Sequence, residues 1–392
     1  MSNSVYHSTI ITAMAMIKHY LLLTVSLLSV STAALVFVSF SDDGSDGKPE
    51  GFPPPLALAA WRLQLTTVFL LALAYRDYKN INDDVVTKYS ANATSTTAKL
   101  LGSGVCLAVH FAAWVASLQK TSIAHSLLFV STTPILIAVV TAARHVRASS
   151  SISCSASVRA ELGAAALGFV GAAMLAMDRQ NAQKGVSPSL SGDAAAFVGA
   201  VAMVGYVLVG SELRQWLPLG LYATPVTGVG AALLTVATAC MPTYGGGPAM
   251  AFAWLTRADW LWRVAYLAVG PGLLGHTAFN ALLKHISPLV ITLALTLEPV
   301  VGTLLGAALS MCDAPSWFAM CAGVVIVGAT VVSAVAPKML ASDGDDDAEN
   351  SKRVSSRSST NLEEEATDED EETTLASSEL VPLVPMNRSP ES

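Results

Sequence analysis

The sequence carries very little charge for its length. Only 13% of its 392 residues are Asp, Glu, Lys or Arg, whereas 53% are hydrophobic, and the mean hydropathy is +0.53. An ordinary soluble protein of this length has a larger share of charged residues on its surface, so the composition excludes that class. It indicates instead a protein that crosses a membrane several times.

Cysteine is scarce as well. The chain has five cysteines, scattered and odd in number. This distribution provides neither a metal-ligand spacing nor a disulfide framework. Four of them lie in or beside apolar runs, where cysteine behaves as a small buried hydrophobic residue: Cys106, Cys240, Cys312 and Cys321. We therefore expect no metal site and no cofactor.

Two motifs of soluble and membrane enzymes are missing. No glycine-rich loop ending in Lys-Ser or Lys-Thr occurs, so the common ATP-binding loop is excluded. No Gly-x-Ser-x-Gly sequence flanks His110 or His276, the histidines that could act as bases. The sequence therefore predicts no enzyme and no catalytic residue. A membrane-embedded enzyme that uses one of these histidines, a receptor and a scaffold remain the alternatives to a carrier.

Ten apolar segments of membrane-spanning length are separated by polar or Gly/Pro-rich breaks. The first, 18–40, contains the small residues 31–34 and could also be a cleaved signal peptide. Between the second and third segments, the polar stretch 76–99 is expected to be a loop. The sequence thus predicts an all-α membrane protein with ten transmembrane helices. The other nine segments are 56–75, 100–118, 122–143, 161–177, 192–213, 219–241, 260–283, 287–311 and 315–336.

Lysine and arginine are unevenly divided between the loops. If the short N-terminal segment 1–17 is cytosolic, the loops that carry most of these residues also face the cytosol. An even number of spans then returns the C-terminus to the same side. We therefore expect both termini in the cytosol, in the plasma membrane or in an endomembrane.

The second half of the chain repeats the first. Aligning Pro134 with Pro299 also aligns Ser122 with Ser287, and it brings His110 within one position of His276. Each half then holds five helices, 18–177 in the first repeat and 192–336 in the second, with 178–191 as a linker. Because five is odd, the second repeat is inverted relative to the first. Inverted repeats are typical of carriers in which a central site faces the two sides alternately.

Glu298 is an ionisable residue deep inside an apolar segment. The ninth segment starts with Ser287 as an N-cap and Pro288 in the first turn, and Glu298 lies near its middle. A charge at that depth costs about 2.5–3.5 kcal/mol on insertion scales, so the carboxylate should face protein or water. Burial disfavours its charged form, whereas water or a cation favours it. Glu298 is therefore the candidate for proton coupling, with a purely structural role as the alternative.

Other polar and aromatic side chains are candidates for lining a solute cavity. Gly272, His276, Asn280 and Lys284 lie four residues apart, so on an α-helix they share one face. Prolines are expected to kink or break helices at Pro134, Pro271 and Pro299, and transporters place their sites at such breaks. Structural packing and, for the arginine, snorkelling to the membrane surface remain alternatives. The cavity candidates are His110, Trp114, Tyr206, His276, Asn280 and Arg62.

The C-terminal segment 337–392 has a different composition. It contains acidic runs at 343–349 and 363–372 and a basic, serine-rich patch at 352–358. Few of its residues can form a core, so we expect a disordered acidic tail in the cytosol. Most of the acidic residues lie there, so the net charge of −7 does not describe the membrane part. The expected partners are a small-molecule solute and the lipid bilayer, with no nucleic acid; a homodimer and kinases acting on the tail are left open.

Over residues 18–336 the chain resembles the EamA-type branch of the drug/metabolite transporter superfamily. The resemblance rests on a helix with a central proline in each half, with Leu297-Glu298-Pro299-Val300 in the second, and on Arg62 after Ala59-Ala60-Trp61. It implies ten helices in two inverted repeats and a secondary transporter of small organic metabolites.

Two departures from the family's pattern limit what the resemblance implies. Asp313 stands where the family usually has Glu after the ninth helix. The first half also has no acidic counterpart of Glu298. The resemblance therefore does not identify the solute.

The predicted orientation can be tested at a glycosylation sequon. Asn92-Ala93-Thr94 would be glycosylated only if its segment faced the lumen, and the Lys/Arg distribution places that segment in the cytosol. We expect Asn92 to remain unmodified in cells. A glycosidase-sensitive mass shift on an immunoblot that disappears in Asn92→Gln would contradict this orientation.

Overall fold

The computed structural model describes residues 2–39, 53–149, 155–178, 189–242, 246–311, 313–337 and Met339. These residues form helices and turns, and they contain no strand. The prediction of an all-α protein is confirmed for them. Nearly all of the predicted tail, 337–392, and most of the predicted linker, 178–191, lie outside the described residues.

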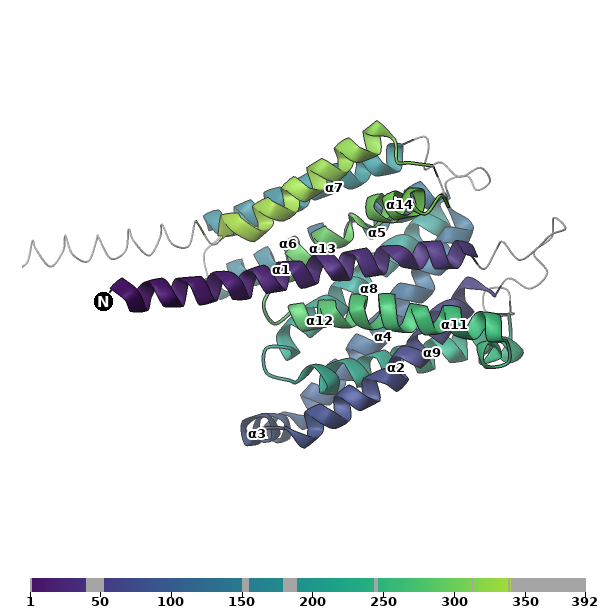
Figure 1. The fold of residues 1–392 in the computed structure, drawn as a ribbon, viewed down its shortest axis with the longest axis horizontal. Coiled ribbons are helices and arrows are strands. Elements are labelled where there is room, and N and C mark those ends of the chain that lie inside the picture. Colours follow the sequence, from purple (N-terminus) through teal and green to yellow (C-terminus); the bar gives the residue numbers. More distant parts are fainter. Residues whose placement is uncertain are drawn as a thin grey trace, which may run out of the picture. The chain divides into compact units, whose positions relative to one another are not determined.

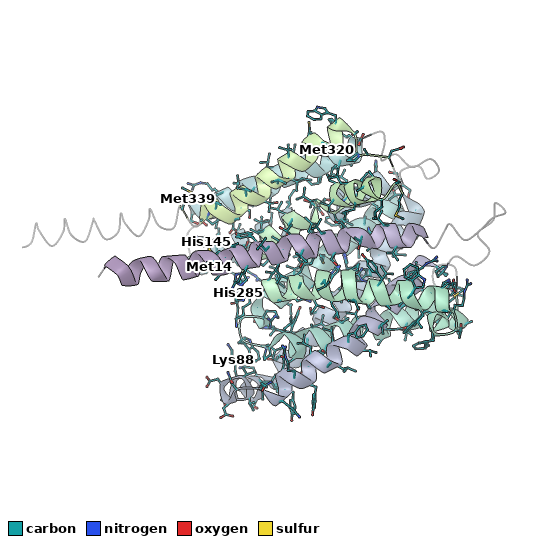
Figure 2. All side chains as sticks on the ribbon, in the orientation of Figure 1. Met14, Lys88, His145, His285, Met320 and Met339 are labelled. Atoms are coloured by element: carbon teal, nitrogen blue, oxygen red, sulfur yellow. The ribbon has the colours of Figure 1, made fainter. Side chains whose placement is uncertain are left out.

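Eight helices of the described chain are long and apolar enough to cross a membrane, and a pair of short helices bent by 41° would make a ninth span. Large hydrophobic side chains such as Val236 and Trp262 are exposed on the helix surfaces. Met14 and Met320 are further examples (Figure 2). In water such surfaces would associate, whereas they match a lipid environment. The eight are Met14–Ala33, Leu56–Lys79, Ala93–Ser117, His125–Ala148, Ala156–Met177, Leu190–Leu213, Leu219–Cys240 and Trp317–Pro337.

The first half of the described chain contains seven labelled helices (Figure 1). The central proline segment forms two helices, α5 and α6, separated by Ser131 and Thr132. The helices are α1 (Ser2–Ser39), α2 (Pro55–Lys79), α3 (Asp83–Ala91), α4 (Ala93–Lys120), α5 (Ile123–Val130), α6 (Thr133–Ser149) and α7 (Ala156–Met177).

The second half begins with α8 (Leu190–Leu213) and α9 (Leu219–Cys240), followed by the short 3₁₀ turns η2 (Pro248–Met250) and η3 (Ala253–Leu255). A continuous helical run then changes type along its length. It consists of α11 (Ala258–Leu267), the π-helix η4 (Ala268–Thr277) and α12 (Ala278–Leu282). The chain continues through α13 (Pro288–Leu295), α14 (Glu298–Ala308) and the helix Trp317–Pro337.

The expectation of a loop at 76–99 is wrong. The helix α2 continues to Lys79, α3 occupies Asp83–Ala91, and α4 begins at Ala93. No residue of α3 is fully buried, and only Val85 and Tyr89 are half-buried, so its apolar face is too short for periodicity to detect. Asp83 and Asp84 lie in its first turn, where negative charge interacts favourably with the helix dipole.

The helices pack in matching combinations from the two halves. Of the helices of the first half, α4 packs against α8 and α9, and α2 packs along α9. The first helix, α1, lies against η4, α12 and α14 (Figure 1). Glycines allow the closest approaches: a Cβ at Gly220 of α9 would lie 2.6 Å from the backbone nitrogen of Ala74 in α2.

This close approach generates a stability prediction. Gly220→Ala places a methyl group against backbone atoms that cannot rotate away, so we expect a loss of about 1–3 kcal/mol in the free energy of unfolding. Gly102→Ala is the matched control, because a Cβ there has no neighbour within 4 Å and alanine favours helix by up to about 1 kcal/mol. Thermal unfolding in detergent measures both variants. Equal melting temperatures for them would contradict the tight α2–α9 contact.

Candidate functional site

Each half contains a helix that is interrupted after eight residues. In the first half, the Ser122 hydroxyl accepts a hydrogen bond from the His125 N–H at 3.3 Å and caps α5. In the second half, the Ser287 hydroxyl accepts one from the Val290 N–H at 3.3 Å and caps α13. Both capped helices have eight residues and end at a two-residue break.

The helices that follow the two breaks also begin alike. Pro134 is the second residue of α6 and Pro299 is the second residue of α14, positions at which a missing N–H leaves no helical bond unmade. Thr133 therefore stands where the second half has Glu298. The serine cap and the proline position are shared, whereas the 41° bend and the acidic residue belong to the second half.

Pro271 lies inside the π-helix η4 rather than at a simple kink. Of the residues expected to share one face, His276 and Asn280 line the same small cavity, described below. Gly272 and Lys284 do not line it. Gly272 meets Thr66 of α2, Asn280 meets Tyr206 of α8, and Lys284 is exposed.

Arg62 is buried among the helices, with 5% of its surface exposed, so its side chain does not snorkel to the surface. Its Nη2 donates a hydrogen bond to the Pro271 carbonyl at 3.0 Å. The guanidinium carbon lies 5.6 Å from the centre of the Phe111 ring, within the range of a cation–π contact. The buried Nε has no hydrogen-bond partner among the described residues. Arg62 thus keeps an unused donor in the interior.

Histidine and phenylalanine rings from α4, η4 and α12 form a row beside Arg62. Ring centres are separated by 5.4 Å between His110 and Phe111, by 5.9 Å between Phe111 and His276, and by 6.2 Å between His276 and Phe279. In the alignment on the two prolines, Phe111 and His276 are equivalent positions. The row therefore joins α4 of the first half to η4 and α12 of the second.

Glu298 is half-buried at the start of α14 and is close enough to Arg62 for their charges to interact. The ion pairs of the described chain do not include these two residues. One buried cation and one carboxylate therefore share the interior without direct contact. His276 and Tyr206 are the other groups whose charges interact with Arg62.

Tyr206 and Asn280 join α8 to α12. The Tyr206 hydroxyl donates to Asn280 Oδ1 at 2.9 Å, and both side chains are buried. The Asn280 backbone carbonyl in turn accepts a bond at 3.0 Å from Nε of Arg214, just after α8. Arg214, which was not among the predicted site residues, thus holds the end of α12 in place.

A small cavity lies between α8, η4, α12 and α13. Its volume of about 10 Å³ is room for about one water molecule, so a metabolite would need the helices to separate. Of the predicted candidates, Tyr206, His276 and Asn280 line it. His110 instead bonds the Gly199 carbonyl at 2.9 Å, and Trp114 packs against the hydrophobic core. The lining is Met203, Tyr206, Val207, His276, Phe279, Asn280, Leu283, Ile291 and Leu295.

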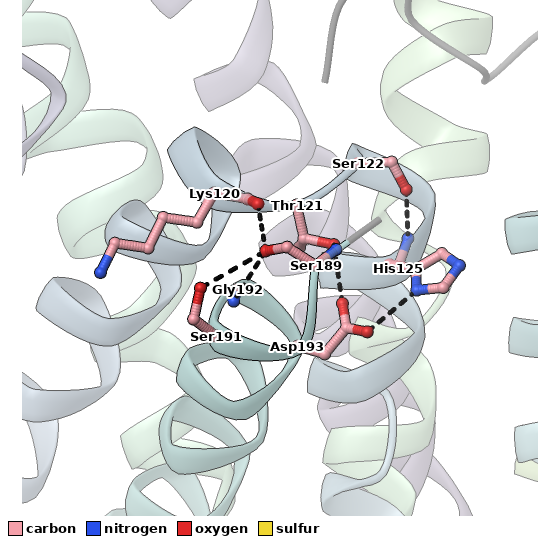
Figure 3. A network of polar contacts seen from close by, with 8 residues as sticks. All are labelled: Lys120, Thr121, Ser122, His125, Ser189, Ser191, Gly192 and Asp193. Carbon is pink, nitrogen blue, oxygen red and sulfur yellow. Dashed lines mark hydrogen bonds and ion pairs between the residues drawn. The ribbon is translucent and has the colours of Figure 1, made fainter. Parts of the chain in front are cut away.

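A second polar cluster closes the ends of α4, α5 and α8 (Figure 3). Asp193 accepts a hydrogen bond from the Thr121 hydroxyl at 2.7 Å and pairs with His125 Nδ1 at 3.2 Å. The Ser189 hydroxyl caps α8 by accepting from the Gly192 N–H and also donates to the Lys120 carbonyl. Sequence reasoning missed this cluster, although Asp193 in the first turn of a helix was a readable signal.

The corresponding ends of α1 and α12 meet differently. His19 and His285 stack with ring centres 4.1 Å apart and an angle of 11° between the planes; His285 follows the end of α12 (Figure 2). The helices α4 and α8 contact each other at one end through a cluster of an acid, hydroxyls and an imidazole. The helices α12 and α1 contact each other at one end through a pair of stacked rings.

Comparison with known proteins shows a likeness of fold alone. No protein-family model matches the chain, and no curated protein sequence matches it. One solved structure, described only as a crystal structure of a protein, has a TM-score of 0.58 over 82% of this chain and 98% of that chain, at 19% sequence identity. At this identity the shared feature is the arrangement of helices.

The Tyr206–Asn280 bond predicts a measurable coupling. Tyr206→Phe and Asn280→Ala should each destabilise the chain, and the double variant should lose less than their sum by about 0.5–1.5 kcal/mol, since the same bond is removed twice. Thermal or denaturant unfolding in detergent gives the four free energies. Tyr206→Phe combined with Ser126→Ala is the control, because Ser126 bonds Ser117 instead. Additivity in the Tyr206–Asn280 cycle would contradict the contact.

Proposed function

We propose that this chain is a secondary transporter that moves a small organic metabolite across a membrane by alternating access. The observation that carries the proposal is the broken helix with the same cap, length and proline position in both halves. In transporters, breaks of this kind lie at the solute site between inverted repeats. The described polar groups and the small cavity gather beside the break in the second half.

Ten spans in two inverted five-helix repeats are part of this proposal. To the eight long helices it adds the bent pair α13 and α14 and the helical run from Ala258 to Leu282. Packing supports the repeat: α8 contacts α4, α5 and α6, and α1, its equivalent, contacts the equivalent elements η4, α12, α13 and α14. We also propose that the chain is an EamA-type transporter with both termini in the cytosol.

Transport is favoured over catalysis by the surroundings of the two histidines. Among the described residues, His110 contacts a backbone carbonyl and the Phe111 ring, while His276 contacts the rings of Phe111 and Phe279. A base that activates a nucleophile would instead lie within hydrogen-bond reach of it. Neither histidine has such a nucleophile among its described contacts, which favours transport over catalysis.

The transport proposal predicts a separation of two activities in Glu298→Gln. Proteoliposomes of the full chain, loaded with a mixture of metabolites and analysed by mass spectrometry, first identify the solute that leaves. For that solute, Glu298→Gln should reduce uptake driven by a pH gradient by roughly tenfold or more, the usual size of a coupling between two sites. Exchange between equal concentrations should continue, because the amide keeps the shape of the side chain.

The matched control is Glu212→Gln, because Glu212 is an exposed carboxylate paired with Lys99. It should transport as the unmodified chain does. Undiminished gradient-driven uptake in Glu298→Gln would contradict proton coupling at Glu298. Absence of protein-dependent flux for every metabolite of the mixture would contradict transport itself.

A further inference from the structure

Arg62 is the starting point, because a buried guanidinium with an unused donor is an unfinished binding group. One hydrogen bond, to the Pro271 carbonyl, is described for it, and Nε has no partner among the described residues. Leaving a charged donor unsatisfied in an apolar interior is unfavourable. The planar guanidinium matches a carboxylate, which can accept two parallel hydrogen bonds from it.

The balance of charge in the site determines whether Glu298 is protonated when a carboxylate binds Arg62. The titratable groups gathered here are Arg62 from α2, His110 from α4, Tyr206 from α8, His276 from η4 and Glu298 from α14. Arg62 is the only one of these that is charged positively at all physiological pH values. A second carboxylate at Arg62 would leave one cation facing two anions in an apolar interior, unless Glu298 takes up a proton.

We propose, as an extension of the transport function proposed above, that the solute carries a carboxylate that binds Arg62 while a proton binds Glu298. One anion and one proton then enter together, and the occupied site carries the same net charge as the empty one. The two binding events favour each other, as linkage requires. The carrier is accordingly an electroneutral symporter of a carboxylate-bearing metabolite with one proton.

The aromatic row completes the expected pocket. Phe111 lies over the guanidinium, and His276 and Phe279 lie between it and the small cavity. The body of the solute would occupy this cavity as the helices separate, against Met203, Val207 and Ile291. We therefore expect a mainly apolar body next to the carboxylate.

The test uses acids paired with their own amides as probes of the full chain in detergent. The pairs are nicotinate with nicotinamide, N-acetylglycine with N-acetylglycinamide and phenylacetate with phenylacetamide, and inorganic phosphate is a separate arm. We expect acids to bind at least tenfold more tightly than their amides by calorimetry. Titrations in two buffers of different ionisation enthalpy should show uptake of about one proton per bound acid, as the charge balance requires.

Variants assign the two roles. Arg62→Gln should bind acid and amide alike, and Arg62→Lys should keep part of the preference, because it retains the charge without the planar fork. Glu298→Gln should bind acids with no proton uptake, whereas Glu212→Gln should behave as the unmodified chain. If Arg62→Gln does not fold, Arg62→Lys and the proton count of Glu298→Gln decide the matter.

The contrary outcomes are distinct from failure of the transport function. Amides that bind as tightly as their acids, no binding of any acid, a preference for phosphate, or acid binding without proton uptake would each overturn this inference. If neutral solutes show saturable flux while acids neither bind nor cross, this inference is overturned and the transport function stands. Proton-linked binding of acids without any flux in proteoliposomes would leave the binding site and overturn transport.

Discussion

The arrangement of the helices depends on one constraint: backbone and charged groups that lie within the apolar part of the bundle must find partners inside the protein. Lipid offers no hydrogen bonds, so a broken helix at that depth is tolerated only where protein or water covers the break. Serine caps and threonine hydroxyls meet this requirement at the breaks; the Thr133 hydroxyl donates to the Val130 carbonyl at 2.8 Å, and the Thr296 hydroxyl to the Leu293 carbonyl at 2.6 Å. The backbone groups at the breaks are therefore bonded within the protein.

The same constraint explains why Arg62 and the π-helix occur together. The guanidinium donates to the carbonyl of Pro271, inside η4. On the same side, the Thr66 hydroxyl donates to the Arg62 carbonyl at 2.7 Å and lies 3.4 Å from the Ala268 carbonyl. The helix α2 thus supplies polar contacts to a segment whose regular hydrogen bonding is altered. A charge on one helix stabilises an irregularity in another.

Much of the helix layout could be predicted from the sequence, because apolar length and proline position are local properties. The Ser287 cap, the Pro288 start of α13 and the interruption beside Pro299 are all readable from consecutive residues. The helix α3 was not predicted, since only Val85 and Tyr89 in it are half-buried, too few residues to give a clear hydrophobic period. The π-helical form of η4 was not predicted either, because proline and glycine indicate irregularity without specifying its hydrogen bonding.

The candidate site was predictable in its residue types and less so in its contacts. Tyr206, His276 and Asn280 line one cavity, yet nothing local to Tyr206 indicates that Asn280, 74 residues later, accepts its hydrogen bond. Trp114 is an aromatic residue of the right helix that packs into the core instead. Long-range partners such as Gln64 and Trp254, joined at 2.8 Å, likewise follow from the fold and not from spacing.

The small size of the central cavity has an electrical consequence. Protons pass rapidly through a protein along an unbroken file of water, and a cavity of about 10 Å³ holds about one molecule. At the depth of Tyr206 and His276, the described conformation therefore interrupts such a file. Protons that crossed the protein through this cavity could therefore do so only when the helices move apart, and at other times this route would not discharge the membrane voltage.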